Sequence, residues 1–336
     1  MRLRTVFFCG DQSPYGRAHL RPVLEHFDVA AVVIASAQRW AKFREALSGL
    51  HVDAGSQKKR KPSRANRPAG YIDVPAIVKE RGVELRIVDD VNAPEFVNEI
   101  RSLDPDLLVC AAYPQIFAQP LLGVPSRGAV NFHPSLLPQF RGAHPHFWAI
   151  ATGAKTGGVS AHFMTTDLDA GDIIAQREFP ISDLTYSQLY ARINEETPPL
   201  VAQVAAFFVD PNAKARPQDH SRATVYRNDR AIHRRIFWNT HTAEEVRNLC
   251  RTEKAFCFLG RDQVQLLGAS ISAGNRNLTN GVRVENGTVV DVDEEAMTIK
   301  AADGCVRIAA VMCGGRRYAA GEFAGQWKVQ IGETLS

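Results

Sequence analysis

Three polar residues of this 336-residue chain have the types and spacing that acyl transfer requires. Asn131 and His133 close an apolar run that starts at Gly128, and Asp169 follows in a turn rich in Gly and Asp. Side chains two residues apart on a strand point the same way, so Asn131 and His133 can converge. We expect Asp169 to be brought up to the imidazole. An oxyanion donor, a proton carrier and a group that orients the carrier together suit acyl transfer.

The first 208 residues alternate short apolar runs with helical patterns, which is typical of βαβ units. This rhythm predicts an α/β domain over residues 1–208, with a mostly parallel Rossmann-like sheet and helices on both faces. Ligands of such sheets bind beyond the carboxyl ends of strands, where Asn131 and His133 lie. We expect strands at Thr5–Cys9, Val29–Ala35, Glu84–Val88, Asp106–Ala112, Gly128–His133 and Gly158–Met164, and helices near Gly16–His26, Val74–Lys79, Glu95–Ser102, His146–Thr152 and Tyr186–Phe208.

The remaining residues predict a basic linker at 209–235 and a second domain at 236–336. Asn286-Gly287 and Asp303-Gly304 are typical hairpin turns, and short β-like segments surround them. A small C-terminal β-barrel of OB type explains this pattern. We expect a helix near Ala243–Cys250 and strands near Phe256–Leu259, Gln263–Ile271, Gly287–Asp291, Met297–Ala301 and Val306–Met312.

Composition narrows the class of protein. Hydrophobic residues make up 45% of the chain, the formal charge is +4, and the surplus lies in the second half, which permits an anionic partner. No apolar stretch approaches the ~20 residues of a membrane span, and we expect a cytoplasmic protein. The six cysteines form no Cys-x-x-Cys pair, so we expect reduced thiols and no metal. The turn after the first strand lacks Gly-x-Gly-x-x-Gly, which disfavours a dinucleotide.

Two motifs surround the predicted site residues. They are Asn131-Phe132-His133-Pro134-Ser135-Leu136-Leu137-Pro138, continued by Arg141-Gly142, and Leu168-Asp169-Ala170-Gly171-Asp172. These motifs resemble those of the 10-formyltetrahydrofolate-dependent formyltransferases. The resemblance is firm over residues 105–181 and looser over the second half, which is similar to the C-terminal barrel of the methionyl-tRNA branch.

The resemblance implies transfer of a formyl group from 10-formyltetrahydrofolate to an amine. In that case Asn131 stabilises the oxyanion, His133 carries protons, and Asp169 orients the imidazole and favours its charged form. It also implies an apolar slot for the folate head group, in which main-chain groups recognise the pteridine. The matching positions are Gln115, Ile116, Phe117, Ser135, Leu136, Leu137, Pro138, Thr165, Thr166, Asp167 and Leu168.

The sequence leaves the acceptor open between a small amine and methionyl-tRNA. We favour a small or nucleotide-linked amine, either an amino sugar or an amino-acid-derived amine, because the Pro-His-Phe-Trp pattern from Pro145 resembles those relatives. Methionyl-tRNA is the alternative, supported by the second domain, the basic linker and a basic loop. Water as acceptor would make the chain a formyltetrahydrofolate hydrolase. Candidate acceptor contacts are Arg141, His144, His146, Lys58, Lys59 and Arg60.

Two further expectations concern a structural role for a histidine and a non-enzymatic role for the chain. His162 alternates with Ser160 and Met164 along an expected strand, which favours a core histidine with satisfied ring nitrogens. A nucleic-acid-binding protein on a retired enzyme scaffold is the non-enzymatic alternative, and the intact set of Asn131, His133 and Asp169 speaks against it. The sequence leaves the oligomeric state open.

Overall fold

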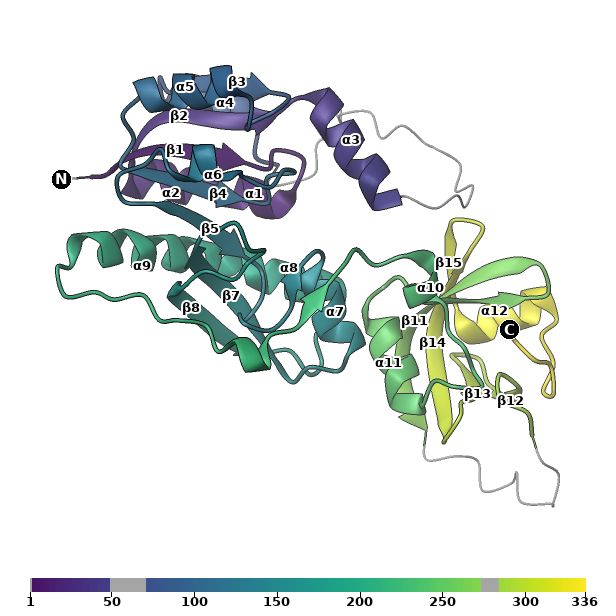
Figure 1. Ribbon diagram of the computed structural model, residues 1–336. Helices are drawn as coiled ribbons and strands as arrows, with labels where there is room; N and C mark the ends of the chain where they lie inside the picture. Colours follow the sequence, from purple (N-terminus) through teal and green to yellow (C-terminus); the bar gives the residue numbers. More distant parts are fainter. Residues whose placement is uncertain (1, 49–70, 273–283) are drawn as a thin grey trace. The chain divides into compact units, whose positions relative to one another are not determined.

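A computed structural model describes residues 2–48, 71–272 and 284–336 (Figure 1). The chain divides into two compact units. Unit 1 comprises residues 1–142, 158–178 and 192–225, and unit 2 comprises residues 143–157, 179–191 and 226–336. Unit 1 holds nearly all of a seven-stranded sheet, and unit 2 holds a six-stranded sheet.

The seven-stranded sheet is parallel over five strands and antiparallel where β5 meets β7. Its order is β3-β2-β1-β4-β5-β7-β8, which confirms the predicted mostly parallel α/β fold. The strands are β1 (Arg4–Cys9), β2 (Asp28–Ala35), β3 (Glu84–Val88), β4 (Leu107–Ala111), β5 (Ala129–His133), β7 (Thr156–Phe163) and β8 (Ile173–Pro180).

Both faces of this sheet are covered. Alternate residues of a strand point to opposite faces, and along β1 both Phe7 and Phe8 are fully buried. Phe8 packs in a cluster with Phe96 of α5 and with Phe117. The helices of unit 1 are α1 (Pro14–Ala18), α2 (Leu20–His26), α3 (Ala37–Ser48), α4 (Val74–Glu80), α5 (Pro94–Ser102), α6 (Gln119–Leu122) and α9 (Thr197–Val209).

The long helix expected over Tyr186–Phe208 is two helices. α8 (Tyr186–Glu195) ends before Glu196, and α9 starts at Thr197 with two prolines directly after it. Proline lacks the N–H that an uninterrupted helix would use, and it disfavours helical backbone at the residue before it. The sequence expectation also missed α3 and the edge strand β8, whose side chains are mostly half-buried rather than alternating.

Unit 2 is built around an antiparallel half-barrel, which confirms the predicted C-terminal β fold. The path β10-β11-β14-β13-β12 is extended by β15 pairing with β14. Its strands are β10 (Phe256–Leu259), β11 (Asp262–Ser272), β12 (Val289–Val292), β13 (Met297–Lys300), β14 (Cys305–Cys313) and β15 (Arg316–Ala319), and its helices are α7 (Pro145–Ala151), α10 (Ala231–Arg234), α11 (Ala243–Arg251) and α12 (Ala320–Trp327).

Helix α11 begins at a capping box and packs against the half-barrel. The Thr242 hydroxyl accepts from the Glu245 N–H at 3.2 Å, and the Glu245 carboxylate accepts from the Thr242 N–H at 2.8 Å. Val246 and Leu249 of the same helix are buried in the core of the unit with Trp238. Among the described residues, no helix is long and apolar enough to cross a membrane.

Gly10 is required where β1 turns toward α1. A Cβ atom at this position would lie 2.1 Å from the Ala112 carbonyl oxygen, so Gly10→Ala must push two backbone segments apart. We expect the variant to lose about 1–3 kcal/mol of unfolding free energy. Urea denaturation measures it. The control is Gly325→Ala in α12, where a Cβ meets nothing within 4 Å; equal stabilities of the two variants would contradict the steric argument.

Candidate active site

Strand β5 carries Asn131 and His133 on one face of the sheet. Asn131 is in register with Cys110 of β4 and with His162 of β7, and His133 is in register with Ser160. The intervening Phe132 points the other way and is 1% exposed. The apolar residues of β5 therefore fix the strand, and the polar residues are presented together near its carboxyl end.

Asp169 reaches both of these side chains. Its Oδ2 lies 3.6 Å from His133 Nδ1, and its Oδ1 accepts from Asn131 Nδ2 at 3.4 Å. The Gly142 N–H donates to Oδ2 at 2.8 Å. Asp169 has a φ of 50°, a left-handed conformation that is uncommon outside glycine and costs energy. Asp169 thus lies within contact distance of both Asn131 and His133, the residues predicted to form a site with it.

His162 is a fourth member of the cluster. Its Nε2 lies 3.2 Å from Asn131 Nδ2 and 3.5 Å from Asp169 Oδ1, and its Nδ1 lies 2.8 Å from the Phe163 carbonyl oxygen. It is a buried histidine with both nitrogens engaged, and the partners of Nε2 are the predicted site residues Asn131 and Asp169. The register of Asn131 with His162 across two antiparallel strands could have indicated this contact, had the pairing of β5 with β7 been known.

Electrostatics favour an ionised Asp169. Burial alone raises the pKa of this carboxyl, but the charge of His133, the hydrogen bond with His162 and the Gly142 N–H together hold the pKa well below its ordinary value. For His133, burial lowers the pKa, and this outweighs the upward effects of Asp169 and of the Phe140 carbonyl. The site combines a fixed negative charge with an imidazole that can lose its proton.

His133 is held from its second nitrogen as well. Nε2 lies 2.9 Å from the Phe140 carbonyl oxygen, and Phe140 has a φ of 59°. The imidazole is therefore bracketed by two acceptors, a carbonyl and a carboxylate. An oriented imidazole beside a carboxylate, with an amide donor on the same face, can carry protons while a carbonyl oxygen gains charge.

The residues predicted to line an apolar slot lie in three segments of unit 1, at 115–117, 135–138 and 165–168. Ser160 Oγ donates to the Ser135 carbonyl at 2.7 Å and accepts from the Leu137 N–H at 3.1 Å. Gln115 bonds Asp90 and the Val91 N–H, while Phe117 is buried in the core. Ile116 and Leu168 are 68% and 49% exposed. Thr165 bonds the Asp167 carbonyl in the same turn as Leu168.

Of the residues predicted to contact an acceptor, Arg141 belongs to unit 1 and is 7% exposed. Its guanidinium donates to Gln218 Oε1 at 2.7 Å and to His220 Nδ1 at 3.2 Å. His144 and His146 belong to unit 2. His146 Nε2 lies 2.8 Å from the Tyr186 hydroxyl. Lys58, Lys59 and Arg60 lie outside the described residues.

His144 forms an ion pair with Asp229, a fully buried carboxylate. Arg234 and Lys254 contact the same carboxylate, at 2.5 and 3.6 Å. Burial alone raises the pKa of Asp229, but His144, Lys254 and Arg234 together bring it well below its usual range. The side chain of His144 is 37% exposed, so unit 2 presents an oriented imidazole at its surface.

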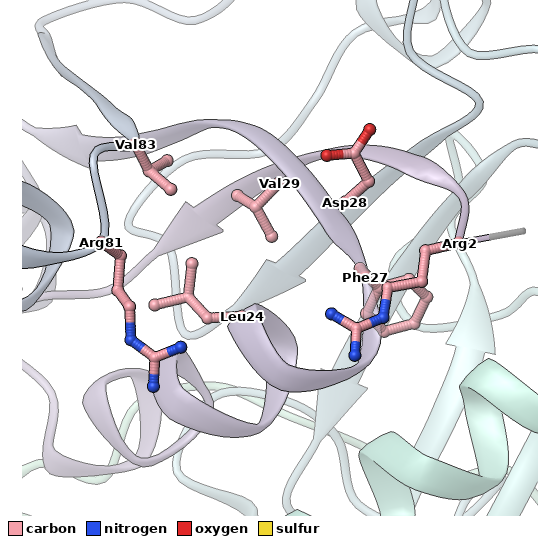
Figure 2. Close-up of a pocket in the computed structure, with 7 residues that line it drawn as sticks. All are labelled: Arg2, Leu24, Phe27, Asp28, Val29, Arg81 and Val83. Atoms are coloured by element: carbon pink, nitrogen blue, oxygen red, sulfur yellow. The ribbon is translucent and has the colours of Figure 1, made fainter.

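A cavity of about 490 Å³ lies at the amino-terminal ends of β1, β2 and β3, away from the carboxyl end of β5 that carries Asn131 and His133. Leu24 of α2 also lines it, with Arg2 and Arg81 on either side of Leu24 (Figure 2). The remaining lining residues are Phe27, Asp28, Val29 and Val83. None of the predicted site residues lines it. Among the described residues, no cluster of His, Cys, Asp and Glu is arranged to hold a metal ion.

Comparison with known proteins gives matches to both halves of the chain. Residues 19–205 match the family described as formyl transferase, and residues 230–326 match the formyl transferase C-terminal domain. The chain is 30% identical to a methionyl-tRNA formyltransferase of Ruminiclostridium cellulolyticum over 268 residues, which is 77% of this chain and 83% of that protein. It is 28% identical to the methionyl-tRNA formyltransferase of Thermotoga maritima over 281 residues, covering 80% and 85% of the two chains.

Among solved structures, the chain resembles an N-formyltransferase from Helicobacter canadensis in complex with folinic acid and dTDP-3-aminofucose. The TM-score is 0.62 at 15% identity, with 95% of this chain and all of that chain covered. At this identity the likeness concerns the fold alone.

Removing the charge of Asp169 is expected to lower the pKa of His133 further. The Asp169 carboxylate raises the pKa of His133, whereas burial lowers it. In Asp169→Asn the upward effect is lost and the lowering by burial remains. The protonated fraction of His133 at a fixed pH near 6 should fall, which NMR titration of the imidazole carbons measures. His19, whose pKa burial lowers to about 4, is the internal control and should not shift. An unchanged His133 titration would show that Asp169 does not act on it.

Proposed function

This chain belongs to the formyl transferase family, and on that premise we propose that it transfers the formyl group of 10-formyltetrahydrofolate to a primary amine. The observation that carries the proposal is the convergence of Asn131, His133 and Asp169 at the end of β5. An amide donor, an imidazole and an ionised carboxylate are the groups that acyl transfer to nitrogen needs.

The amine nitrogen attacks the formyl carbon, and the electron pair of the C=O bond moves onto oxygen. Asn131 donates from Nδ2 to this oxygen as its charge develops. His133 takes a proton from the attacking nitrogen and delivers a proton to N10 as the bond between the formyl carbon and N10 breaks. Asp169 stabilises the imidazolium in between. The products are a formamide and tetrahydrofolate, so atoms and charges balance.

Two observations support a folate head group near these residues. Ile116 and Leu168 are among the few large apolar side chains left well exposed, and both lie on segments predicted for the slot. The segment from Ser135 to Pro138 is fixed by Ser160 and by Gln176, whose Nε2 donates to the Leu137 carbonyl at 2.8 Å. A rigid, largely main-chain wall with apolar neighbours suits a pteridine, which hydrogen-bonds along its edge.

For the acceptor, we propose methionyl-tRNA, in place of the small amine that the sequence motif favoured. The support is the family relationship over both domains, at 28–30% identity to methionyl-tRNA formyltransferases. Exposed Arg316 and Arg317 on β15 add positive charge to the half-barrel. Phosphate contacts made by such residues would give affinity that falls with salt concentration.

A small amine is the second candidate because of the aromatic arrangement after Gly142. Trp148 stacks on Tyr226 with ring centroids 4.7 Å apart, and its indole N–H donates to the Arg227 carbonyl at 2.8 Å. With the oriented His144 imidazole, these side chains make a surface of aromatic rings in unit 2. Such a surface suits a nucleotide-linked amino sugar or an amino-acid-derived amine.

Truncating the proposed catalytic groups should abolish turnover without unfolding the protein. We expect Asn131→Ala to lower kcat by about 10²–10³-fold, because an oxyanion donor is lost. We expect His133→Ala to lower kcat by about 10²–10⁴-fold, because proton transfer is lost. Tetrahydrofolate release, followed by absorbance, measures both. The matched controls are the exposed Asn98→Ala and His26→Ala, and near-normal turnover of either site variant would refute its role.

The acceptor is assigned by turnover of 10-formyltetrahydrofolate with methionyl-tRNA, nucleotide-linked amino sugars, free amino acids or no acceptor. The proposal expects turnover with methionyl-tRNA and a KM for it that rises steeply between 50 and 200 mM salt, roughly as expected for several phosphate contacts. Turnover with a small amine alone would support the second candidate. Turnover without acceptor would make the chain a formyltetrahydrofolate hydrolase.

A further inference from the structure

The segment Arg216–Thr224, predicted to be part of a linker, belongs to unit 1 and is hydrogen-bonded at both of its ends to residues near the candidate site. We call it the bracing segment. At its start, the Arg216 N–H and carbonyl exchange two 2.8 Å bonds with Ile173 at the head of β8. At its end, Thr224 bonds the segment Phe140–Gly142. Ile173 follows the turn that carries Asp169. The segment Phe140–Gly142 supplies the Phe140 carbonyl that contacts His133 and the Gly142 N–H that donates to Asp169.

Gln218 braces the turn that carries Asp169. It is 5% exposed, in a stretch whose neighbours are exposed. Its Nε2 donates to the Asp169 carbonyl at 2.8 Å and to the Gly171 carbonyl at 2.7 Å. Both N–H groups of the Gln218 amide therefore donate to the turn. Because Asp169 has a left-handed backbone, bonds to its own carbonyl and to that of Gly171 oppose relaxation of the turn.

The oxygen of Gln218 is held by a buried charge. Arg141 donates to Gln218 Oε1 from Nε at 3.2 Å and from Nη2 at 2.7 Å. A guanidinium buried to this degree needs acceptors, and this geometry fixes the amide so that its N–H groups face the turn. Arg141 directly precedes Gly142, whose N–H donates to Asp169 Oδ2. The pair therefore links the backbone of Asp169 to the donor that binds its carboxylate.

Thr224 braces the other partner of the site. Its hydroxyl accepts from the Phe140 N–H at 2.8 Å, and its carbonyl accepts from the Arg141 N–H at 2.9 Å. Phe140, again left-handed, presents its carbonyl to His133 Nε2 at 2.9 Å. The Thr224 hydroxyl thus fixes the peptide that precedes Phe140, and the Thr224 carbonyl fixes the Phe140–Arg141 peptide, whose own carbonyl faces the imidazole.

We propose that Gln218 and Thr224 are positioning residues for formyl transfer, Gln218 through Asp169 and Thr224 through the Phe140 carbonyl and His133. This inference rests on the proposed function for its effect on turnover, but its effect on the His133 imidazole stands apart from it. The bracing segment is then part of the active site, and residues 1–208 alone lack a component that the reaction requires.

Gln218→Met tests the proposed role of Gln218. It has similar size and no charge, so it removes the two donors to the turn without adding an electrostatic effect. We expect kcat to fall roughly 10- to 100-fold with little change in KM for either substrate, since small misplacements act on the reacting centre. We also expect the NMR-measured pKa of His133 to fall toward its value in Asp169→Asn. Gln326→Met, the same change at an exposed position of α12, should alter neither quantity.

Gln218→Met strips the buried Arg141 of an acceptor and is thereby expected to lose stability. The double variant Arg141→Met/Gln218→Met removes both partners and keeps the test usable if the single variant does not fold. It should still show the lowered His133 pKa, because the turn carbonyls have lost the same donors. A folded single or double variant with wild-type His133 titration would overturn the role of Gln218.

Two conservative substitutions test the proposed role of Thr224. Thr224→Val keeps the shape but loses the acceptor for the Phe140 N–H, whereas Thr224→Ser keeps it. We expect Val to lower kcat at least tenfold and to move the His133 titration, and Ser to restore both. Equal behaviour of Val and Ser would overturn the role of Thr224. If the wild type itself fails to turn over 10-formyltetrahydrofolate, the proposed function fails, and the titrations still decide the positioning roles.

Discussion

The buried negative charge of Asp169 is the constraint around which the rest of the site is arranged. A carboxylate taken out of water is costly unless charges and hydrogen bonds replace its hydration. Here His133 and His162 approach its two oxygens, Asn131 donates to one and the Gly142 N–H to the other. Because its pKa is depressed in the folded state, this ionisation contributes stability above the unfolded pKa of about 3.9. That contribution is lost as pH falls toward the folded value.

The fold supplies these partners from distant parts of unit 1. Strand β5 presents Asn131 and His133, antiparallel pairing with β7 adds His162, and the turn before β8 carries Asp169. The bracing segment closes the arrangement by holding Asp169 through Gln218 and the Phe140 peptide through Thr224. Gly171 is needed in the turn, since a Cβ there would lie 2.1 Å from the Phe163 carbonyl oxygen. In the proposed mechanism, formyl transfer uses a geometry whose strain, at Asp169 and Phe140, is held by hydrogen bonds from outside the proposed catalytic set.

Sequence reasoning located Asn131, His133 and Asp169 because local signals sufficed: alternation on a strand, an apolar run and a recognisable turn. The strands of unit 1 other than β8 and the half-barrel followed from the same kind of signal. Sequence reasoning did not predict the buried contacts of Gln218, because its partners lie in a turn far away in sequence and its neighbours resemble a polar linker. His162 was assigned to the core because only the cross-strand register with Asn131 reveals its partners. The break between α8 and α9 had a local signal in Pro198-Pro199 that the helical periodicity obscured.

Asp169 must be ionised in the folded protein if the neighbouring histidines and amides stabilise its charge. An NMR titration of the Asp169 carboxyl carbon, in protein labelled with 13C at aspartate and assigned with Asp169→Asn, measures this ionisation. We expect this carbon to keep its ionised chemical shift below about pH 4, where an ordinary aspartate takes up its proton. A midpoint at or above the ordinary value of about 3.9 would show that the site does not stabilise the charge.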